Sequence, residues 1–330
     1  MDVTEIPRIQ HDFPPEPEEA RKVRLERLDQ IKAEFIHAWT GYKEHAWLKD
    51  EVAPISGDSR DTLGGWAATL VDSLDTLWIM DLKPDFEDAV AAVNAIDFST
   101  CTLSELNVFE ATTRHLGGLL SAYDVSDGQY PTLLQKAWEL GHMLYAAFDT
   151  PNRMPVTRWN FRDAADGKPQ EASDAALSAE MGSLTLEFTR LSQLTGDVRF
   201  FDAAQRVMDV FDEQQNRTRL PGMWPVAVNA RDLDFTAWNS FTIGGMADSL
   251  YEYLPKVRGL GFISPLVSKK RKRKKKRKRD GERDARRETS KQASINQKKT
   301  FAHTVPNSNT PSSAAQPRST ASSSKPQPPR

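Results

Sequence analysis

The aromatic residues of this 330-residue chain lie almost entirely within its first 267 positions, which limits where a hydrophobic core can form. Of 29 aromatic residues, only Phe301 lies beyond that point. The remaining stretch holds 20 of the 44 Lys and Arg residues, and 11 of them form the unbroken run 269–279, from Lys269 to Arg279. Such a segment cannot bury enough apolar surface to offset the entropy that ordering costs. The sequence therefore predicts an acidic folded body and a disordered basic tail over 256–330.

Apolar residues within the body recur at spacings of three and four, the period of one helix face. The clearest stripes are Leu28, Ile31, Phe35, Trp39, Tyr42 and Ala46, and then Leu177, Met181, Leu184, Phe188 and Leu191. About eight helices are expected, with no alternating strand longer than about four residues. One helix is expected over 104–123, begun by a capping box at Thr102 and Glu105, and the last near 236–254. These patterns predict an all-α fold over 20–255, preceded by an extended, proline-rich arm over 1–19.

Two pairs of adjacent glycines interrupt apolar helical patterns beside an acidic residue. A glycine inside a helix costs about 1 kcal/mol relative to alanine, so the pair at 117–118 predicts the close approach of a backbone or a ligand. Glu110 and Arg114 precede the pair at 117–118, and their i,i+4 spacing is by itself typical of a surface ion pair. Asp248 follows the pair at 244–245. A carboxylate placed there is either hydrogen-bonded for structural reasons or directed into a cavity.

Three further residues admit two interpretations. Glu180 borders an apolar stripe and, on pattern alone, is typical of a solvated boundary residue. Trp159 and Trp224 fall in predicted loops, where each is either a core residue or a platform for stacking a sugar ring.

The single cysteine, Cys101, excludes a disulfide within the chain. The sequence also lacks a phosphate-binding loop and the residue spacing of a zinc site.

Seven stretches of the body form an ordered series: 35–47, 50–54, 69–80, 108–123, 148–155, 186–197 and 247–254. They include Val-Asp-Ser-Leu-Asp-Thr-Leu at 71–77 and Val-Phe-Glu at 108–110. Together they resemble the class I α-1,2-mannosidases, glycoside hydrolase family 47, in the form found in filamentous fungi. This resemblance implies the N-terminal half of an (αα)7 barrel and a bound Ca²⁺. It also implies inverting hydrolysis of terminal α-1,2-linked mannose from high-mannose N-glycans.

The resemblance also implies roles for four residues. Glu110 falls on the family's acid-side carboxylate, which acts through a water molecule, and Asp248 falls on a second catalytic carboxylate. Arg114 falls on the neighbouring arginine of the active site. Glu180 falls on a carboxylate that lines the sugar-binding site. An inverting glycosidase holds its acid and its base about 6.5–9.5 Å apart to admit a water molecule, and two carboxylates from different helix pairs could meet in this way.

The resemblance ends at about Leu254, roughly halfway through the family's catalytic domain. The family's third active-site carboxylate and its Ca²⁺-binding threonine belong to the other half. We therefore expect no metal ligand in this chain, and no activity from the chain alone. The family acts in the secretory pathway, in the endoplasmic reticulum or Golgi or outside the cell. The N-terminus nevertheless has neither the pattern of a signal sequence nor that of a membrane anchor.

Two other functions stay open at this point. One is a non-catalytic, glycan-binding relative of the mannosidases that keeps Glu110 and Asp248 without turnover. The other is a nuclear or nucleic-acid-associated protein that binds polyanions without sequence preference through the run 269–279. Such a run is also typical of a segment that is simply solvated.

Overall fold

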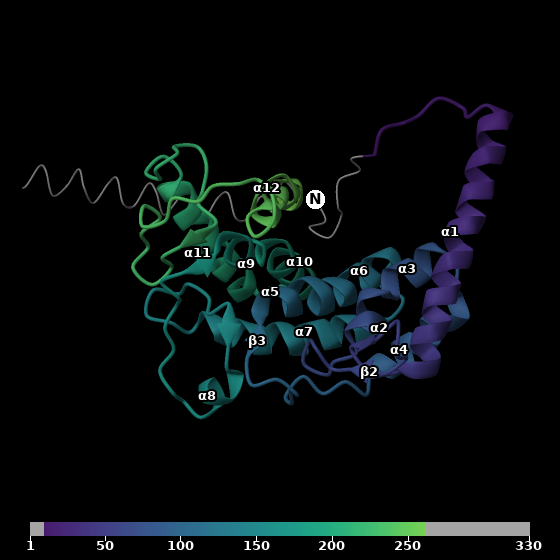
Figure 1. The fold of residues 1–330 in the computed structure, drawn as a ribbon, viewed down its shortest axis with the longest axis horizontal. Coiled ribbons are helices and arrows are strands. Elements are labelled where there is room, and N and C mark those ends of the chain that lie inside the picture. Colours follow the sequence, from purple (N-terminus) through teal and green to yellow (C-terminus); the bar gives the residue numbers. More distant parts are fainter. Residues whose placement is uncertain (1–9, 262–330) are drawn as a thin grey trace, which may run out of the picture. The chain divides into compact units, whose positions relative to one another are not determined.

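A computed structural model describes residues 10–261, so that the basic run 269–279 lies outside the described residues. Helices form most of this part of the chain, as expected of an all-α fold (Figure 1). The longer helices are α1 (Glu18–His45), α4 (Lys83–Val93), α6 (Gly117–Val125), α7 (Pro131–Tyr145), α10 (Thr185–Thr195), α11 (Val198–Gln214) and α12 (Asp248–Gly261). The shorter ones are α2 (Ala68–Asp72), α3 (Leu74–Ile79), α5 (Val108–Glu110), α8 (Phe161–Ala165) and α9 (Ser178–Gly182), with a π-helical turn η1 (Ala111–Leu116) and a 3₁₀ turn η2 (Ala146–Phe148).

The helices pack both against neighbours in the sequence and against helices farther along the chain. Helix α6 packs against α3 and α7, while α10 packs against α11 and α12. Contacts between α7 and α10 join these two groups into one core. The largest fully buried side chains of this core include Trp66, Tyr42, Phe86, Phe188, Phe200 and Phe211. Helices that share one core are the packing that the helical stripes and short turns predict.

The first glycine pair marks a close approach of two backbones. A Cβ atom on Gly118 would lie 2.5 Å from the backbone oxygen of Val71, so that only glycine lets α6 approach α2 this closely. The prediction of a close approach at this pair is therefore confirmed, and the approaching group is a backbone. The second pair differs, because Gly244 and Gly245 lie in an exposed turn before α12 and nothing stands within 4 Å of a Cβ on Gly245.

Two expected helix starts are wrong. The helix expected from about 104 begins at Val108, because Leu106 and Asn107 are paired as a strand and Asn107 supplies the N-cap in place of Thr102. The last helix begins at Asp248 rather than near 236, because 236–247 follow an irregular path through turns. Asp248 therefore stands at the start of a helix and not inside one.

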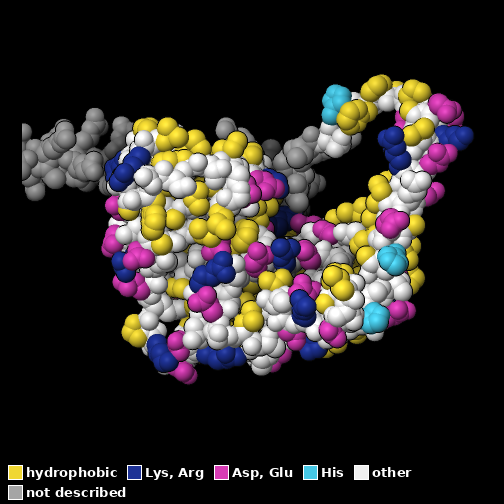
Figure 2. Space-filling view, in the orientation of Figure 1, with side chains coloured by type: hydrophobic (Ala, Val, Ile, Leu, Met, Phe, Trp, Pro, Cys, Tyr) yellow, Lys and Arg dark blue, Asp and Glu magenta, His cyan; other side chains and the backbone are white. Residues whose placement is uncertain are grey.

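The apolar stripe of α1 is buried only in its second half. Trp39, Tyr42 and Ala46 are buried, whereas Leu28 and Ile31 are 49% and 56% exposed. Val23 and Leu25 are further exposed apolar side chains of the first half, and Figure 2 shows hydrophobic side chains along this projecting part of the helix. The first half of the stripe stays exposed because the other described elements do not extend along the first half of α1 (Figure 1).

Three antiparallel ladders of two-residue strands tie loops to the helices. They pair β1 (Glu51–Val52) with β2 (Ser59–Arg60), β3 (Leu106–Asn107) with β4 (Arg158–Trp159), and β5 (Ala176–Leu177) with β6 (Ala227–Val228). Strand β3 runs directly into α5, and β5 runs directly into α9. In each case the third residue of the helix is a glutamate, Glu110 or Glu180. The chain thus repeats one strand-to-helix device at both of these predicted site residues.

Candidate active site

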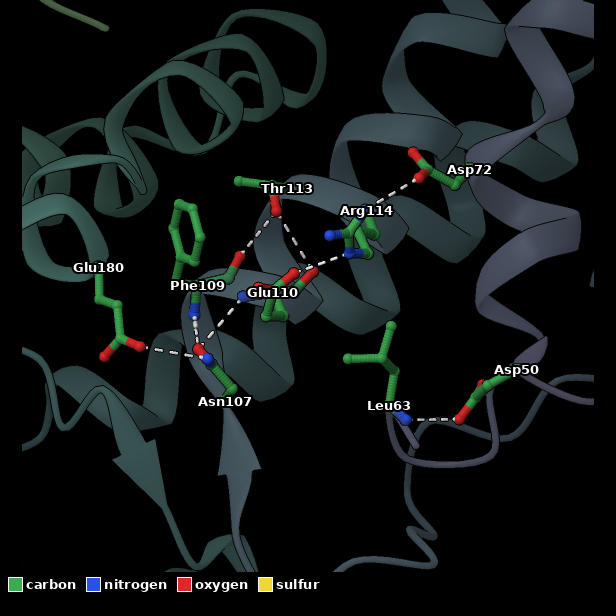
Figure 3. A network of polar contacts seen from close by, with 9 residues as sticks. All are labelled: Asp50, Leu63, Asp72, Asn107, Phe109, Glu110, Thr113, Arg114 and Glu180. Carbon is green, nitrogen blue, oxygen red and sulfur yellow. Dashed lines mark hydrogen bonds and ion pairs between the residues drawn. The ribbon is translucent and has the colours of Figure 1, made fainter. Parts of the chain in front are cut away.

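Glu110 is held by a capped helix start. The side-chain oxygen Oδ1 of Asn107 accepts hydrogen bonds from the backbone N–H groups of Phe109, at 3.0 Å, and of Glu110, at 3.3 Å. A cap of this kind satisfies donors that the first helical turn leaves without partners. It therefore fixes the direction in which α5 leaves β3, and with it the position of the Glu110 carboxylate (Figure 3).

Arg114 joins Glu110 to a second carboxylate. Its Nε donates to Oε2 of Glu110 at 2.7 Å, and its Nη1 lies 3.4 Å from Oδ2 of Asp72 on α2. Burial alone would lower the pKa of Arg114, but the two carboxylates outweigh it and hold that pKa above its ordinary value. Burial raises the pKa of Asp72, although Arg114 opposes the shift. The three side chains form one charged cluster that remains partly open to solvent (Figure 3).

This cluster lines a cavity of about 650 Å³. The volume falls in the range of small-molecule sites, which combine a concave wall with a few convergent polar groups. The wall carries the carboxylates of Asp72 and Glu110 and the guanidinium groups of Arg114 and Arg158, beside apolar residues such as Leu63 and Leu106. Such a mixture suits a ligand that carries many hydroxyl groups on a partly apolar ring.

Asp50 builds one wall of the cavity and has no oxygen left for a ligand. It is 1% exposed, and it accepts four backbone hydrogen bonds, from Leu63, Gly65, Trp66 and Ala68, at 2.7–3.1 Å. A buried carboxylate needs such partners to offset its loss of hydration. Asp50 therefore orders the loop that leads into α2, from which Asp72 reaches the cavity.

Glu180 lies behind the cavity wall. It is 6% exposed, and its Oε1 accepts a hydrogen bond from Nδ2 of Asn107 at 3.3 Å (Figure 3). The same oxygen accepts a hydrogen bond from Nη2 of Arg158. The interpretation of Glu180 as a solvated boundary residue is wrong, because these two partners hold the carboxylate inside the structure. Asn107 thus connects Glu180 to the helix start that carries Glu110.

A sequence profile of the glycosyl hydrolase family 47 matches residues 34–316 of the chain. The chain belongs to this family. The match continues past Leu254 into residues outside the described range. The family resemblance inferred from seven separate stretches is confirmed by this match.

Relatives within the family are similar over most of this chain. A mannosyl-oligosaccharide 1,2-alpha-mannosidase from Arabidopsis thaliana is 38% identical over 237 residues, which cover 71% of this chain and 41% of the relative. The endoplasmic reticulum mannosyl-oligosaccharide 1,2-alpha-mannosidase of Homo sapiens is 39% identical over 223 residues, which cover 67% of this chain and 31% of the relative.

A solved structure, the α-1,2-mannosidase from Trichoderma reesei, matches with a TM-score of 0.59 at 30% identity. The match covers 70% of this chain and 49% of that structure. It confirms the all-α fold class and agrees with the expectation of about half of a barrel. The chain spans less than half the length of each of these three proteins.

The four predicted site residues of this family 47 chain fall in three places. Glu110 and Arg114 meet directly, and Glu180 is connected to them through Asn107. Asp248 is exposed at the start of α12, where its Oδ1 accepts a hydrogen bond from the backbone N–H of Ser249 at 2.9 Å. Within residues 10–261, Asp248 forms no hydrogen bond or ion pair with the other three, and it does not line the cavity.

The described residues do not fit the Ca²⁺ that the family implies. Calcium takes six to eight oxygen ligands, and residues 10–261 hold no group of three acidic, His or Cys residues arranged for a metal ion. Two of the carboxylates at the cavity are already engaged, Asp50 by backbone N–H groups and Glu110 by Arg114. No step of the chemistry is therefore assigned to a metal within this part of the chain.

The two tryptophans for which a core position and a sugar platform both stayed open are core residues. Trp159 and Trp224 are 3% and 4% exposed, and their indole N–H groups donate to Gln170 and to the backbone oxygen of Phe211. Three residues at the site were not anticipated, namely Asp72 as the second partner of Arg114, Asn107 as the cap and Arg158 in the wall. Two of these three had a signal in the sequence: Asn107 is a favoured cap residue, and Asp72 lies within a stretch that resembles the family.

Proposed function

We propose that this chain contributes the acid side of the site at which a family 47 mannosidase hydrolyses terminal α-1,2-linked mannose from high-mannose N-glycans. The observation that carries the proposal is the Glu110–Arg114–Asp72 cluster in the wall of a sugar-sized cavity. The names of the relatives supply the substrate class, since those proteins are mannosyl-oligosaccharide 1,2-alpha-mannosidases.

In this proposal Glu110 acts on the leaving oxygen through a water molecule. Its Oε2 is occupied by Arg114, so that Oε1 is the atom that faces the water. Arg114 fixes the carboxylate and binds sugar hydroxyl groups, because a guanidinium group presents several donors in a rigid plane. Asp72 holds the far side of that guanidinium group. Asp248 is proposed as the carboxylate that acts with the attacking water, on the strength of the resemblance.

We propose that residues 20–255 form the N-terminal half of the barrel domain, with 1–19 as an arm and 256–330 as a tail. Hydrolysis then requires residues beyond those described, since Asp248 does not line the cavity, and the chain by itself releases no mannose. A Ca²⁺ requirement and action in the secretory pathway are proposed from the family alone.

Among residues 10–261, no helix has the length and apolar character to cross a bilayer. Polyanion binding by the run 269–279 is a separate proposal that rests on its eleven consecutive cations.

The binding half of this proposal is tested by titrating mannose into the full chain and following the backbone amide signals of Glu110 and Asn107 by NMR. Arg114→Ala should weaken binding about tenfold or more, because a hydrogen bond to a charged group contributes roughly 1.5–3 kcal/mol. Glu110→Gln keeps the shape of the side chain and should change affinity less than about threefold. The matched control is Arg206→Ala, which removes a half-exposed arginine on α11 that pairs with Asp202 outside the cavity. Wild-type affinity in Arg114→Ala would show that the cavity is not the sugar site.

A further inference from the structure

Arg158 is directed into the cavity by the pairing of two short strands. In the β3–β4 ladder it stands opposite Asn107, next to Trp159, which stands opposite Leu106. Successive side chains of a strand point to opposite faces. Trp159 is buried at 3% exposure, whereas the side chain of Arg158 is 53% exposed and lines the cavity. Strand β4, and not a helix, therefore places the guanidinium group of Arg158 in the cavity wall.

Glu180 anchors this cation from behind. Its buried Oε1 accepts from Nη2 of Arg158 and also from Nδ2 of Asn107. A guanidinium group carries five N–H donors, and only one of its nitrogens is used here. Within the described residues, Nε and Nη1 of Arg158 have no hydrogen-bond partner. Arg158 is thus fixed in place while most of its donors stay available to a ligand.

The two arginines of the cavity lie on different sides of Glu110. Arg114 and Asp72 lie on one side, while Asn107 and Glu180 lie on the other (Figure 3). Arg158 is bound to Glu180 and so belongs to that second side. A single sugar ring on the Arg114 side would leave the free donors of Arg158 without a partner. A ligand with two rings, joined by the bond that Glu110 serves, would contact both guanidinium groups.

We propose that Arg158 binds the second sugar ring, on the leaving-group side of the glycosidic bond, and so makes the site selective for a linked disaccharide over free mannose. Glu180 is in this view a positioning residue that acts through Arg158. The inference rests on the proposed function, because it takes the Glu110–Arg114 side as the place of the terminal mannose.

The test compares the affinities of mannose and α-1,2-mannobiose for the full chain by NMR titration. Arg158→Ala should weaken mannobiose about tenfold and mannose less than about twofold, as expected for one charge-assisted hydrogen bond to the second ring. Glu180→Gln should shift the ratio of the two affinities in the same direction. Arg158→Lys should restore part of the loss, because it keeps the charge but not the planar fork. Arg206→Ala, as the control, should leave the ratio unchanged.

The outcomes separate the two proposals. If the wild-type chain binds mannobiose more tightly than mannose and Arg158→Ala removes the difference, the inference stands. If Arg158→Ala weakens both sugars equally, or neither, while the wild type binds both, the role of Arg158 is refuted and the proposed function survives. If the wild type binds neither sugar, the proposed function fails, and the role of Arg158 is overturned with it.

Discussion

At the scale of single residues, two buried ionisable groups that do not line the cavity contribute to the response of stability to pH. Glu187 on α10 is 6% exposed, and its Oε1 accepts a hydrogen bond from the hydroxyl of Tyr253 at 2.7 Å. Burial raises the pKa of Glu187 to about 7, against the opposing effects of Tyr253 and Lys256. His115 behaves in the opposite sense, since burial lowers its pKa to about 4. The contributions of these two groups to the unfolding free energy therefore change with pH in opposite directions.

Glu187→Gln should remove the contribution of Glu187 to the pH dependence of the unfolding free energy and leave the contribution of His115. A carboxyl group whose pKa is raised in the folded state contributes stability that is fully present below its unfolded pKa, about 4.5, and is lost as pH rises to about 7. The wild type should thus lose on the order of 3 kcal/mol relative to Glu187→Gln across this window. Urea unfolding of both proteins at a series of pH values measures the difference. A difference that stays constant, or that grows with pH in favour of the wild type, would contradict a buried, protonated Glu187.

Sequence reasoning at this scale succeeds where partners are close in the chain. The i,i+4 spacing of Glu110 and Arg114 predicts the ion pair that the structure contains. The third member, Asp72, lies 42 positions from Arg114 and reaches it only because α2 packs beside η1. Arg158 likewise depends on a strand pairing across about fifty residues, for which two-residue strands leave no periodic signal.

At the scale of elements, the chain uses interruptions of helices to shape the site. The chain is divided at Ser73 into α2 and α3, and the helix that carries Arg114 contains the π-helical turn η1. π-Helical turns are rare and frequently stand at functional sites. Apolar spacing cannot reveal such breaks, because a one-residue interruption leaves the stripe nearly in phase. The cap at Asn107 is a polar side-chain contact, which a hydrophobic pattern does not record.

The two glycine pairs allow a matched test of the packing between α6 and α2. In Gly118→Ala the new methyl group would collide with the backbone of Val71, so that the variant should lose about 1–3 kcal/mol despite the better helix propensity of alanine. Gly245→Ala adds a methyl group into open space and should change stability by less than about 0.5 kcal/mol. Denaturant midpoints of both variants give the comparison. Equal effects at the two positions would mean that α6 does not approach α2 as closely as the structure shows.

At the scale of the whole molecule, the chain covers less than half of each relative that it resembles. Its helical periodicity predicts the fold class, because helix packing follows from the stripes. The same periodicity overstates burial at Leu28 and Ile31, since a stripe indicates that a face favours burial but not which surface covers it. The pairing of Glu110 with Asp248 as catalytic carboxylates comes from the family resemblance and stays a prediction; within the described residues, Glu110 lines the cavity and Asp248 does not.

The most direct test of the account is hydrolysis by a chimera in which residues 10–261 precede the second half of the Trichoderma reesei α-1,2-mannosidase. Given α-1,2-mannobiose and followed by NMR, the chimera should release mannose first as the β anomer, the product of inversion. Glu110→Gln in the chimera should lower turnover by about 10²–10⁴-fold, the usual contribution of a general acid. The chain without the added half should release none. Release of the α anomer first, or full activity in Glu110→Gln, would contradict the assignment of Glu110 to the acid side of this site.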